Sequence, residues 1–232
     1  DPIHGAVHKQ RLVNALTIGE SHFFRNAGQF DALFQYVLPE IIERRRSLHT
    51  LRIWSAGCAG GQEPYSIAMM LRELLLDVDD WSITILGTDI NTTALDQAQQ
   101  AVYSDWAFRE TRALELRPRY FRPVGKRYEL RPEVRRMVNF AQLNLADDHY
   151  PSFQTNTAFM DLILCRNVAI YFAPAITRAV VARFYSALTD EGWLAVGHSE
   201  HSVITYQQFQ MHSYPNAILY PRTGQPMKVP ED

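Results

Sequence analysis

The stretch Leu51–Ala68, LRIWSAGCAGGQEPYSIA, decides the fold of this chain. Its first four residues form a run that is typical of a short buried strand. Three glycines follow within a few residues, and an apolar pattern of helical period begins near Ile67. The order of strand, glycine-rich turn and helix lets the backbone approach a ligand and directs helix N–H groups toward it.

The spacing of these glycines argues against two common classes of nucleotide-binding protein. The dinucleotide pattern G-x-G-x-x-G and the lysine of a Walker loop are both absent from the sequence. Neither a nicotinamide enzyme nor an NTPase is therefore favoured. On the glycines alone, a plain tight turn between strand and helix is an equally good interpretation.

A second predicted strand, Ser82–Asp89 (SITILGTD), ends in an acid. If this strand lies parallel to the first, Asp89 comes beside the glycine turn, at the carboxyl edge of the sheet. A carboxylate there can accept hydrogen bonds from both hydroxyls of a ribose. The two features together favour a ligand site over a plain turn.

The run AGGQEPYSIA resembles the A-S-T-G-E-E-P-Y-S-I-A loop of the chemoreceptor glutamate methyltransferases (CheR), which are class I S-adenosylmethionine-dependent methyltransferases. Three further stretches are similar to that family: FFR at Phe23–Arg25, CRNVAIYF at Cys165–Phe172 and GHSE at Gly197–Glu200. The four motifs occur in the family's order. The resemblance implies an α/β fold with a doubly wound, mostly parallel, Rossmann-like sheet and a small antiparallel β insertion.

The same resemblance implies an activity, methyl transfer from S-adenosylmethionine to glutamate side chains of chemoreceptors, which leaves S-adenosylhomocysteine as the product. A carboxylate is already ionised at pH 7, so the reaction needs no general base. Two alternatives stay open. The chain could be a class I methyltransferase with another acceptor, or a non-catalytic module that binds the cofactor or its demethylated product and regulates a partner.

The resemblance also assigns the residues of the site, and no metal is expected among its ligands. Arg25 and Tyr171 are the predicted catalytic residues, which hold the acceptor carboxylate. The predicted cofactor-binding residues share a place at strand ends or in the loops that face them: Ser21, Ala56, Gly57, Gly61, Glu63, Asp89, Asn144, Leu145, Arg166 and Asn167. His198 of the GHSE motif is given a structural part, because the central step moves no proton.

Several of these residues also have a plain structural interpretation. Arg25 could be a surface arginine, Glu63 an acid that complements a helix dipole, and Asn144 a turn residue. The chain departs from the family at Gly19, where Asn is frequent, and at Gln62, where Glu is usual. We expect the second departure to remove one negative charge beside the cofactor.

The family resemblance and the changes of periodicity along the chain together predict the domain organisation. Residues 1–27 are expected to form the end of an N-terminal helical region with its linker, residues 28–222 the methyltransferase domain, and residues 223–232 a disordered tail. Within the domain, residues 119–140 are expected to form the antiparallel subdomain, with three short strands at residues 119–122, 127–130 and 137–140.

Periodicity predicts the remaining elements. Gly28–Ser47 is expected to be a helix kinked at Pro39, and Asn91–Val102 a helix capped by Asn91. Because Phe23 and Phe24 are adjacent, one of them is expected to be partly exposed. A helix over Pro174–Leu188 is expected to place these residues on its core face: Ile176, Val180, Phe184 and Leu188.

Composition and charge limit the partners. The 232 residues carry 23 basic and 25 acidic side chains, a net charge of −2, which favours neither nucleic acid nor an anionic membrane as an obligatory partner. We expect Cys58 and Cys165 to be free thiols, which favours the cytoplasm. No signal peptide or membrane-spanning stretch is expected, and we expect a monomer.

The predicted insertion bears on how the protein meets its receptor. Some members of the CheR family dock on a peptide at the receptor's C-terminal end, which adds a strand to this insertion. Here the turn between Phe121 and Tyr128 is short, with one glycine and with Pro123, which withholds a backbone donor. We expect direct binding to the helical methylation region without this tether peptide. Alternatively, the hairpin only covers the core.

Overall fold

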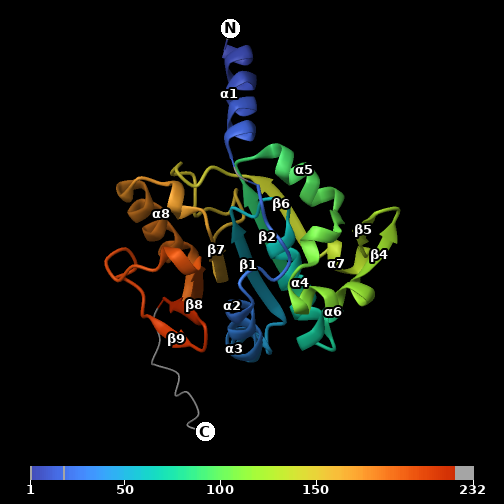
Figure 1. Cartoon of the computed structure of the whole chain (residues 1–232). Coiled ribbons are helices and arrows are strands. Elements are labelled where there is room, and N and C mark those ends of the chain that lie inside the picture. Colours follow the sequence, from blue (N-terminus) through green and yellow to red (C-terminus); the bar gives the residue numbers. More distant parts are fainter. Residues whose placement is uncertain (1, 18, 223–232) are drawn as a thin grey trace.

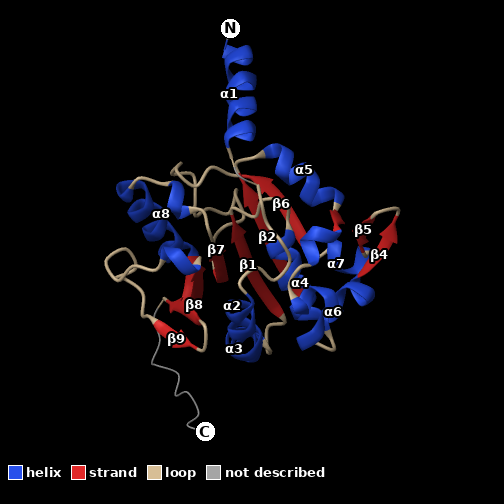
Figure 2. Ribbon diagram, in the orientation of Figure 1, coloured by secondary structure: helices blue, strands red, loops and turns tan. Residues whose placement is uncertain are grey.

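The computed structural model describes residues 2–17 and 19–222, with its elements arranged as in Figures 1 and 2. The tail expected at residues 223–232 lies outside the described residues. The N-terminal helix α1 (Pro2–Leu16) projects from the body of the molecule. None of the helices in the described ranges combines the length and the apolar composition that a bilayer crossing requires.

The central sheet has seven strands in the order β6-β2-β1-β7-β8-β10-β9. The first five in this order are mutually parallel, and β10 runs antiparallel to both β8 and β9. This mostly parallel sheet with a closing hairpin confirms the predicted fold class. The strands are β1 (Thr50–Ala56), β2 (Ser82–Asp89), β6 (Val138–Gln142), β7 (Met160–Cys165), β8 (Leu188–Val196), β9 (His212–Tyr214) and β10 (Ala217–Pro221).

Helices cover both faces of this sheet (Figure 2). Ile53 of β1 belongs to a core cluster with α3 (Leu38–Arg45) and α4 (Gln62–Leu74). The next residue, Trp54, belongs to a second cluster with α8 (Pro174–Ala187). This alternation is the two-sided burial expected of a parallel strand. The other helices are α2 (Ala27–Ala32), α5 (Thr92–Gln100), α6 (Thr111–Tyr120) and α7 (Pro132–Arg135).

The helix expected over Gly28–Ser47 contains a local irregularity. A π-helical turn, η1 (Leu33–Val37), joins α2 to α3 directly before Pro39. Proline cannot donate the hydrogen bond of a regular helix, and a wider turn accommodates that loss. The structure thus has a π turn directly before the position where the sequence predicted a kink.

The predicted third strand of the insertion was wrong. The small antiparallel sheet has the order β3-β5-β4, formed by β3 (Val102–Ser104), β5 (Arg127–Leu130) and β4 (Phe121–Val124). The strand expected at residues 137–140 is instead β6, which pairs parallel with β2 in the main sheet. Alternating side chains predict a strand but do not specify its partner, which is the physical reason for the error.

Three smaller expectations also differ from the structure. The capped helix ends at Gln100 rather than Val102, because Ala101 adopts a left-handed conformation with φ of 54°. Phe23 and Phe24 are both fully buried, since Phe24 has a positive φ and its N–H donates to the Ser66 Oγ. Ile176 is exposed, and the buried residues of α8 are Val180, Val181, Phe184 and Ala187.

Candidate functional site

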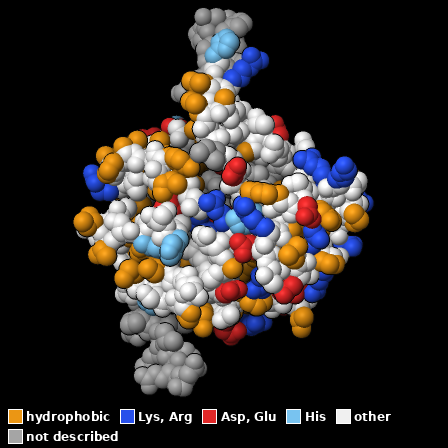
Figure 3. Space-filling model, in the orientation of Figure 1, with side chains coloured by type: hydrophobic (Ala, Val, Ile, Leu, Met, Phe, Trp, Pro, Cys, Tyr) orange, Lys and Arg blue, Asp and Glu red, His pale blue; other side chains and the backbone are white. Residues whose placement is uncertain are grey.

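A cavity of about 470 Å³ opens beyond the carboxyl ends of β1, β2 and β7. Its wall also includes the segment before α2 and the loop after β6. Figure 3 shows a hollow at the centre of the molecule with basic and acidic side chains gathered around it. A crevice at this edge of an open α/β sheet is where such folds bind ligands, and the volume suits a small-molecule site.

Both predicted catalytic residues and eight of the ten predicted cofactor residues line this cavity. They are Arg25 and Tyr171, together with Ser21, Gly57, Glu63, Asp89, Asn144, Leu145, Arg166 and Asn167. Segments as distant in sequence as Ser21 and Tyr171 therefore meet in one place.

Ala56 and Gly61, the other two predicted cofactor residues, are not among the residues that line the cavity. Ala56 is fully buried in the core cluster that includes Trp54. Gly61 begins α4 with φ of 84°, and a side chain there would come within 2.8 Å of the Ala98 Cβ and 3.1 Å of Phe140. The absence of a side chain at Gly61 thus serves packing of the turn.

Gly57 is the glycine that shapes the cavity wall. Its φ is 81°, and a Cβ atom at this position would collide with the Val168 side chain. Its N–H donates to the Thr88 carbonyl at 2.7 Å, which ties the turn to the end of β2. Only glycine adopts this positive φ without strain and also lacks the Cβ atom that would collide with Val168.

Asp89 occupies the place that its position in the sequence predicted. β1 and β2 are parallel neighbours, with Ala56 opposite Thr88, so Asp89 lies beside the glycine turn. The Ala59 N–H donates to its Oδ2 and the Asn91 N–H to its Oδ1, each at 2.8 Å. These bonds fix the carboxylate at the cavity edge and leave lone pairs for further donors.

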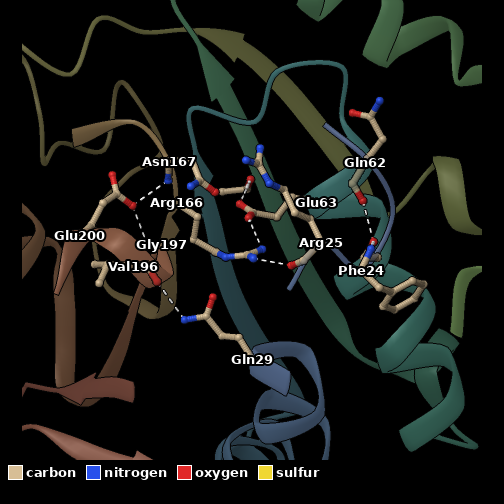
Figure 4. Close-up of polar contacts among 12 residues, drawn as sticks. Phe24, Arg25, Gln29, Gln62, Glu63, Arg166, Asn167, Val196, Gly197 and Glu200 are labelled. Atoms are coloured by element: carbon tan, nitrogen blue, oxygen red, sulfur yellow. Dashed lines mark hydrogen bonds and ion pairs between the residues drawn. The ribbon is translucent and has the colours of Figure 1, made fainter. Parts of the chain in front are cut away.

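Glu63 and Arg166 form a buried ion pair in the floor of the site (Figure 4). The Arg166 Nη1 donates to the Glu63 Oε2 at 2.9 Å, and its Nη2 donates to the carbonyl of Arg25. The Glu63 Oε1 accepts from the Ser55 hydroxyl at 2.7 Å. Burial lowers the pKa of Arg166, and the Glu63 carboxylate opposes that shift. Because the two charges are opposite, the pair adds no net charge to the cavity wall.

Gln62 stands apart from this pair. Its side chain is buried, does not line the cavity, and in Figure 4 lies away from Glu63 and Arg166. The expectation that the loss of a glutamate here removes a charge beside the cofactor is therefore not supported by its position.

Glu200 is a structural centre of the site that the sequence analysis missed. One of its carboxylate oxygens accepts from the N–H groups of Gly197 and Asn167, both at 2.6 Å, and the other from Val168 at 2.9 Å and Ala169 at 2.7 Å. These bonds hold the loop that carries Asn167 and leads to Tyr171. The sequence did contain a signal for this role, since Glu200 is an acid within the GHSE motif, which directly follows a buried strand.

Arg25 and Tyr171 lie at the mouth of the cavity. Tyr171 is 63% exposed, in the short 3₁₀ turn η4 (Ala169–Tyr171). The Arg25 Nη1 donates to the Glu20 carbonyl at 3.2 Å. Within the described part of the chain, Arg25 forms no ion pair with a carboxylate, so its charge is available to an incoming anion.

The two cysteines are buried and free, as predicted. Burial raises the pKa of both the Cys58 and the Cys165 thiol, which keeps them protonated and unreactive. His198 is exposed and does not line the cavity.

Comparison with known proteins gives a consistent set of relatives. The family model described as "CheR methyltransferase, SAM binding domain" matches residues 19–218. A chemotaxis protein methyltransferase of Borreliella burgdorferi is 33% identical over 205 residues, which cover 84% of this chain and 69% of the relative. Chemotaxis protein methyltransferase 2 of Vibrio cholerae is 36% identical over 191 residues, 82% of this chain and 65% of the relative.

A third relative, a probable chemotaxis protein methyltransferase of Rhizobium etli, is 36% identical over 200 residues, 84% of this chain and 72% of that protein. In all three comparisons the match extends over most of this chain. The chain spans about two thirds of the length of these relatives.

Proposed function

The chain belongs to the CheR methyltransferase family, and from this premise we propose that its cavity transfers a methyl group from S-adenosylmethionine to glutamate side chains of chemoreceptors. The family match gives S-adenosylmethionine as the cofactor and methyl transfer in chemotaxis as the activity. The proposal that glutamate is the acceptor rests on the Arg25 guanidinium, which lines the same cavity as Asp89 and the glycine turn. Its charge suits a carboxylate.

The residues of the cavity fit the cofactor. The carboxylate of Asp89 is fixed at the strand edge, where it can accept from ribose hydroxyls, and the bare backbone of Gly57 allows close approach. Asn144 and Leu145 are proposed to flank the adenine ring, and Glu63 to meet the ammonium group. Bound in this way, S-adenosylmethionine supplies the electrophilic methyl group.

The acceptor side of the mechanism rests on orientation. A glutamate carboxylate is already nucleophilic at neutral pH, so no residue has to remove a proton. Arg25 and the Tyr171 hydroxyl are proposed to hold its oxygen in line for attack, and closure by the receptor helix would exclude water. Well-oriented reactants can gain on the order of 7–11 kcal/mol relative to free reactants. The methyl ester of the product is uncharged and no longer forms an ion pair with Arg25, which favours product release.

Incubation with labelled S-adenosylmethionine and a chemoreceptor cytoplasmic fragment tests this proposal. Transfer of label to the fragment is the expected result. Labelling of other proteins in place of the fragment would indicate a different acceptor, and cofactor binding without any transfer would indicate a non-catalytic module.

We expect Asp89→Ala to weaken binding of S-adenosylmethionine. The variant leaves the ribose hydroxyls without their charged acceptor, which costs on the order of 1.5–3 kcal/mol. Titration calorimetry measures the difference, with Asp96→Ala on the exposed side of α5 as the matched control. An unchanged affinity in Asp89→Ala would remove Asp89 from the cofactor site.

Arg25→Ala and Tyr171→Phe are expected to lower turnover much more than cofactor affinity. Each removes a hydrogen bond to the acceptor carboxylate, and about 1.4 kcal/mol corresponds to a tenfold change in rate. Single-turnover methylation and cofactor titration separate the two effects. A variant that loses cofactor binding while retaining turnover at saturation would show that its residue is misassigned.

We propose that the receptor is bound directly, without a C-terminal tether peptide. β4 is one of the two edge strands of the small sheet, the other being β3, and its turn to β5 consists of Gly125 and Lys126 alone. Pro123 lies within β4 and provides no backbone donor there. The β4 edge therefore offers little support for an added strand, and the β3 edge is only three residues long.

A peptide that copies a receptor tail should show no saturable binding, and tight binding would overturn direct docking. Arg127 and Arg131 are exposed and are proposed to face acidic receptor helices. Charge reversal at both should slow receptor methylation. If methylation is unaffected, the hairpin serves only to cover the core.

A further inference from the structure

A second arginine lies in the cavity wall beside the predicted acceptor residues. Arg109 follows the 3₁₀ turn η3 (Asp105–Phe108) and lines the cavity together with Arg25 and Tyr171. Among the residues that the structure describes, neither arginine forms an ion pair with a carboxylate. Two guanidinium groups from distant segments thus bring positive charge to the cavity wall. Figure 3 shows basic side chains around the central hollow, with acidic side chains among them.

The Arg109 side chain is held in place by two aromatic rings. Its guanidinium lies 3.7 Å over the Trp106 ring, and its Nη2 is 2.8 Å from the His22 Nδ1. The His22 Nε2 lies 3.1 Å from the Glu110 Oε1. Arg109 and Trp106 are exposed, whereas His22 is buried, so the histidine anchors this arrangement to the protein interior.

The partners of His22 determine its protonation. Arginine can only donate, so the Nδ1 must accept and the ring proton must lie on the Nε2, which donates to Glu110. Burial lowers the pKa of His22, and the charges of Arg109 and Arg25 lower it further, against the opposing effect of Glu110. The ring is therefore neutral at neutral pH, as an acceptor for Arg109 requires.

One N–H of Arg109 is used in this contact, and stacking on Trp106 leaves the edge of the guanidinium open. The remaining donors form the planar fork that binds carboxylates. We propose that Arg109 is a second acceptor-binding residue, which binds the carboxylate of the glutamate to be methylated, and that His22 and Trp106 position it. This inference rests on the proposed function and adds a residue that none of the four sequence motifs contains.

Steady-state methylation of a chemoreceptor cytoplasmic fragment tests this role. Arg109→Gln should raise the KM for the fragment about tenfold or more, the loss expected for a charge-assisted hydrogen bond, and leave cofactor affinity unchanged. The matched control is Arg46→Gln, which makes the same change in charge at an exposed position near the amino end of β1. Arg109→Lys should restore part of the affinity.

Competition separates carboxylate binding from general docking. A fragment with glutamine at its acceptor positions should inhibit the wild type much less than the glutamate fragment does. In Arg109→Gln the two fragments should inhibit more equally, because the variant has lost the interaction with the negative charge of the glutamate. An unchanged preference and unchanged KM in Arg109→Gln, with a wild type that methylates the fragment, would overturn the inference and leave the proposed function intact.

His22→Phe tests the positioning role. The substitution keeps a ring but removes the acceptor for Arg109, so it should raise the KM for the fragment as Arg109→Gln does. In the double variant the effects should not add, since both changes remove the same interaction. Full additivity, or a His22→Phe variant with normal KM, would show that His22 does not act through Arg109.

Discussion

Glu200→Ala is expected to lower the free energy of unfolding by roughly 4 kcal/mol, taking about 1 kcal/mol for each of the four backbone N–H groups that lose their acceptor. The effect should extend to function. Asn167 has a positive φ of 60°, a conformation that the surrounding hydrogen bonds must maintain. Release of this loop should weaken both cofactor binding and turnover.

Denaturant unfolding with and without cofactor measures both consequences. Glu200→Gln keeps one acceptor oxygen but turns an NH₂ group toward donors, so it should lie between the wild type and Glu200→Ala. The control is Glu43→Ala, which removes a carboxylate that is 75% exposed. A loss below about 1 kcal/mol in Glu200→Ala would contradict the role assigned to these hydrogen bonds.

Glu63→Gln is expected to destabilise the protein by about 3–5 kcal/mol, because it leaves the Arg166 charge buried without its counter-ion. Only 3% of the Arg166 side chain and 12% of the Glu63 side chain are accessible, so solvent cannot replace the missing partner. Cofactor affinity should fall as well if Glu63 meets the ammonium group. Unfolding curves and cofactor titration together measure the two effects.

A double variant and a remote pair provide the controls. Glu63→Gln combined with Arg166→Met removes both charges and should be more stable than Glu63→Gln alone. Asp161→Asn breaks the pair with Arg45 near the amino end of β1, where the two side chains are 2.6 Å apart. That variant should lose stability and keep normal cofactor affinity. Equal cofactor affinity in Glu63→Gln and the wild type would exclude the ammonium contact.

The elements that local sequence determines were predicted well. The strand Ser82–Asp89 agrees at both ends, and Asn91 caps α5 through its side chain, which accepts from the Ala94 N–H at 3.0 Å. The position of Asp89 followed from two strand ends meeting at one sheet edge. The strand and the cap are each predicted by a pattern within a few residues, whereas the place of Asp89 needed the general rule that parallel strands end at the same edge of a sheet.

What could not be predicted depends on contacts between distant segments. The alternation at residues 137–140 predicts a strand, yet only the folded sheet shows that it pairs with β2. Glu200 caps a loop that begins 33 residues earlier, and Arg109 meets a histidine 87 residues away. No local period or spacing encodes such pairs, because the partners are brought together by the topology of the sheet.

The most direct test of the central claim is the chemical identity of the methylated group. A chemoreceptor cytoplasmic fragment is incubated with the protein and labelled S-adenosylmethionine, and the labelled residue is then located by mass spectrometry. The account predicts a methyl ester on glutamate side chains, labile to mild base and absent from a fragment with glutamine at those positions. A base-stable methyl group on another residue, or bound cofactor with no methyl transfer, would contradict it.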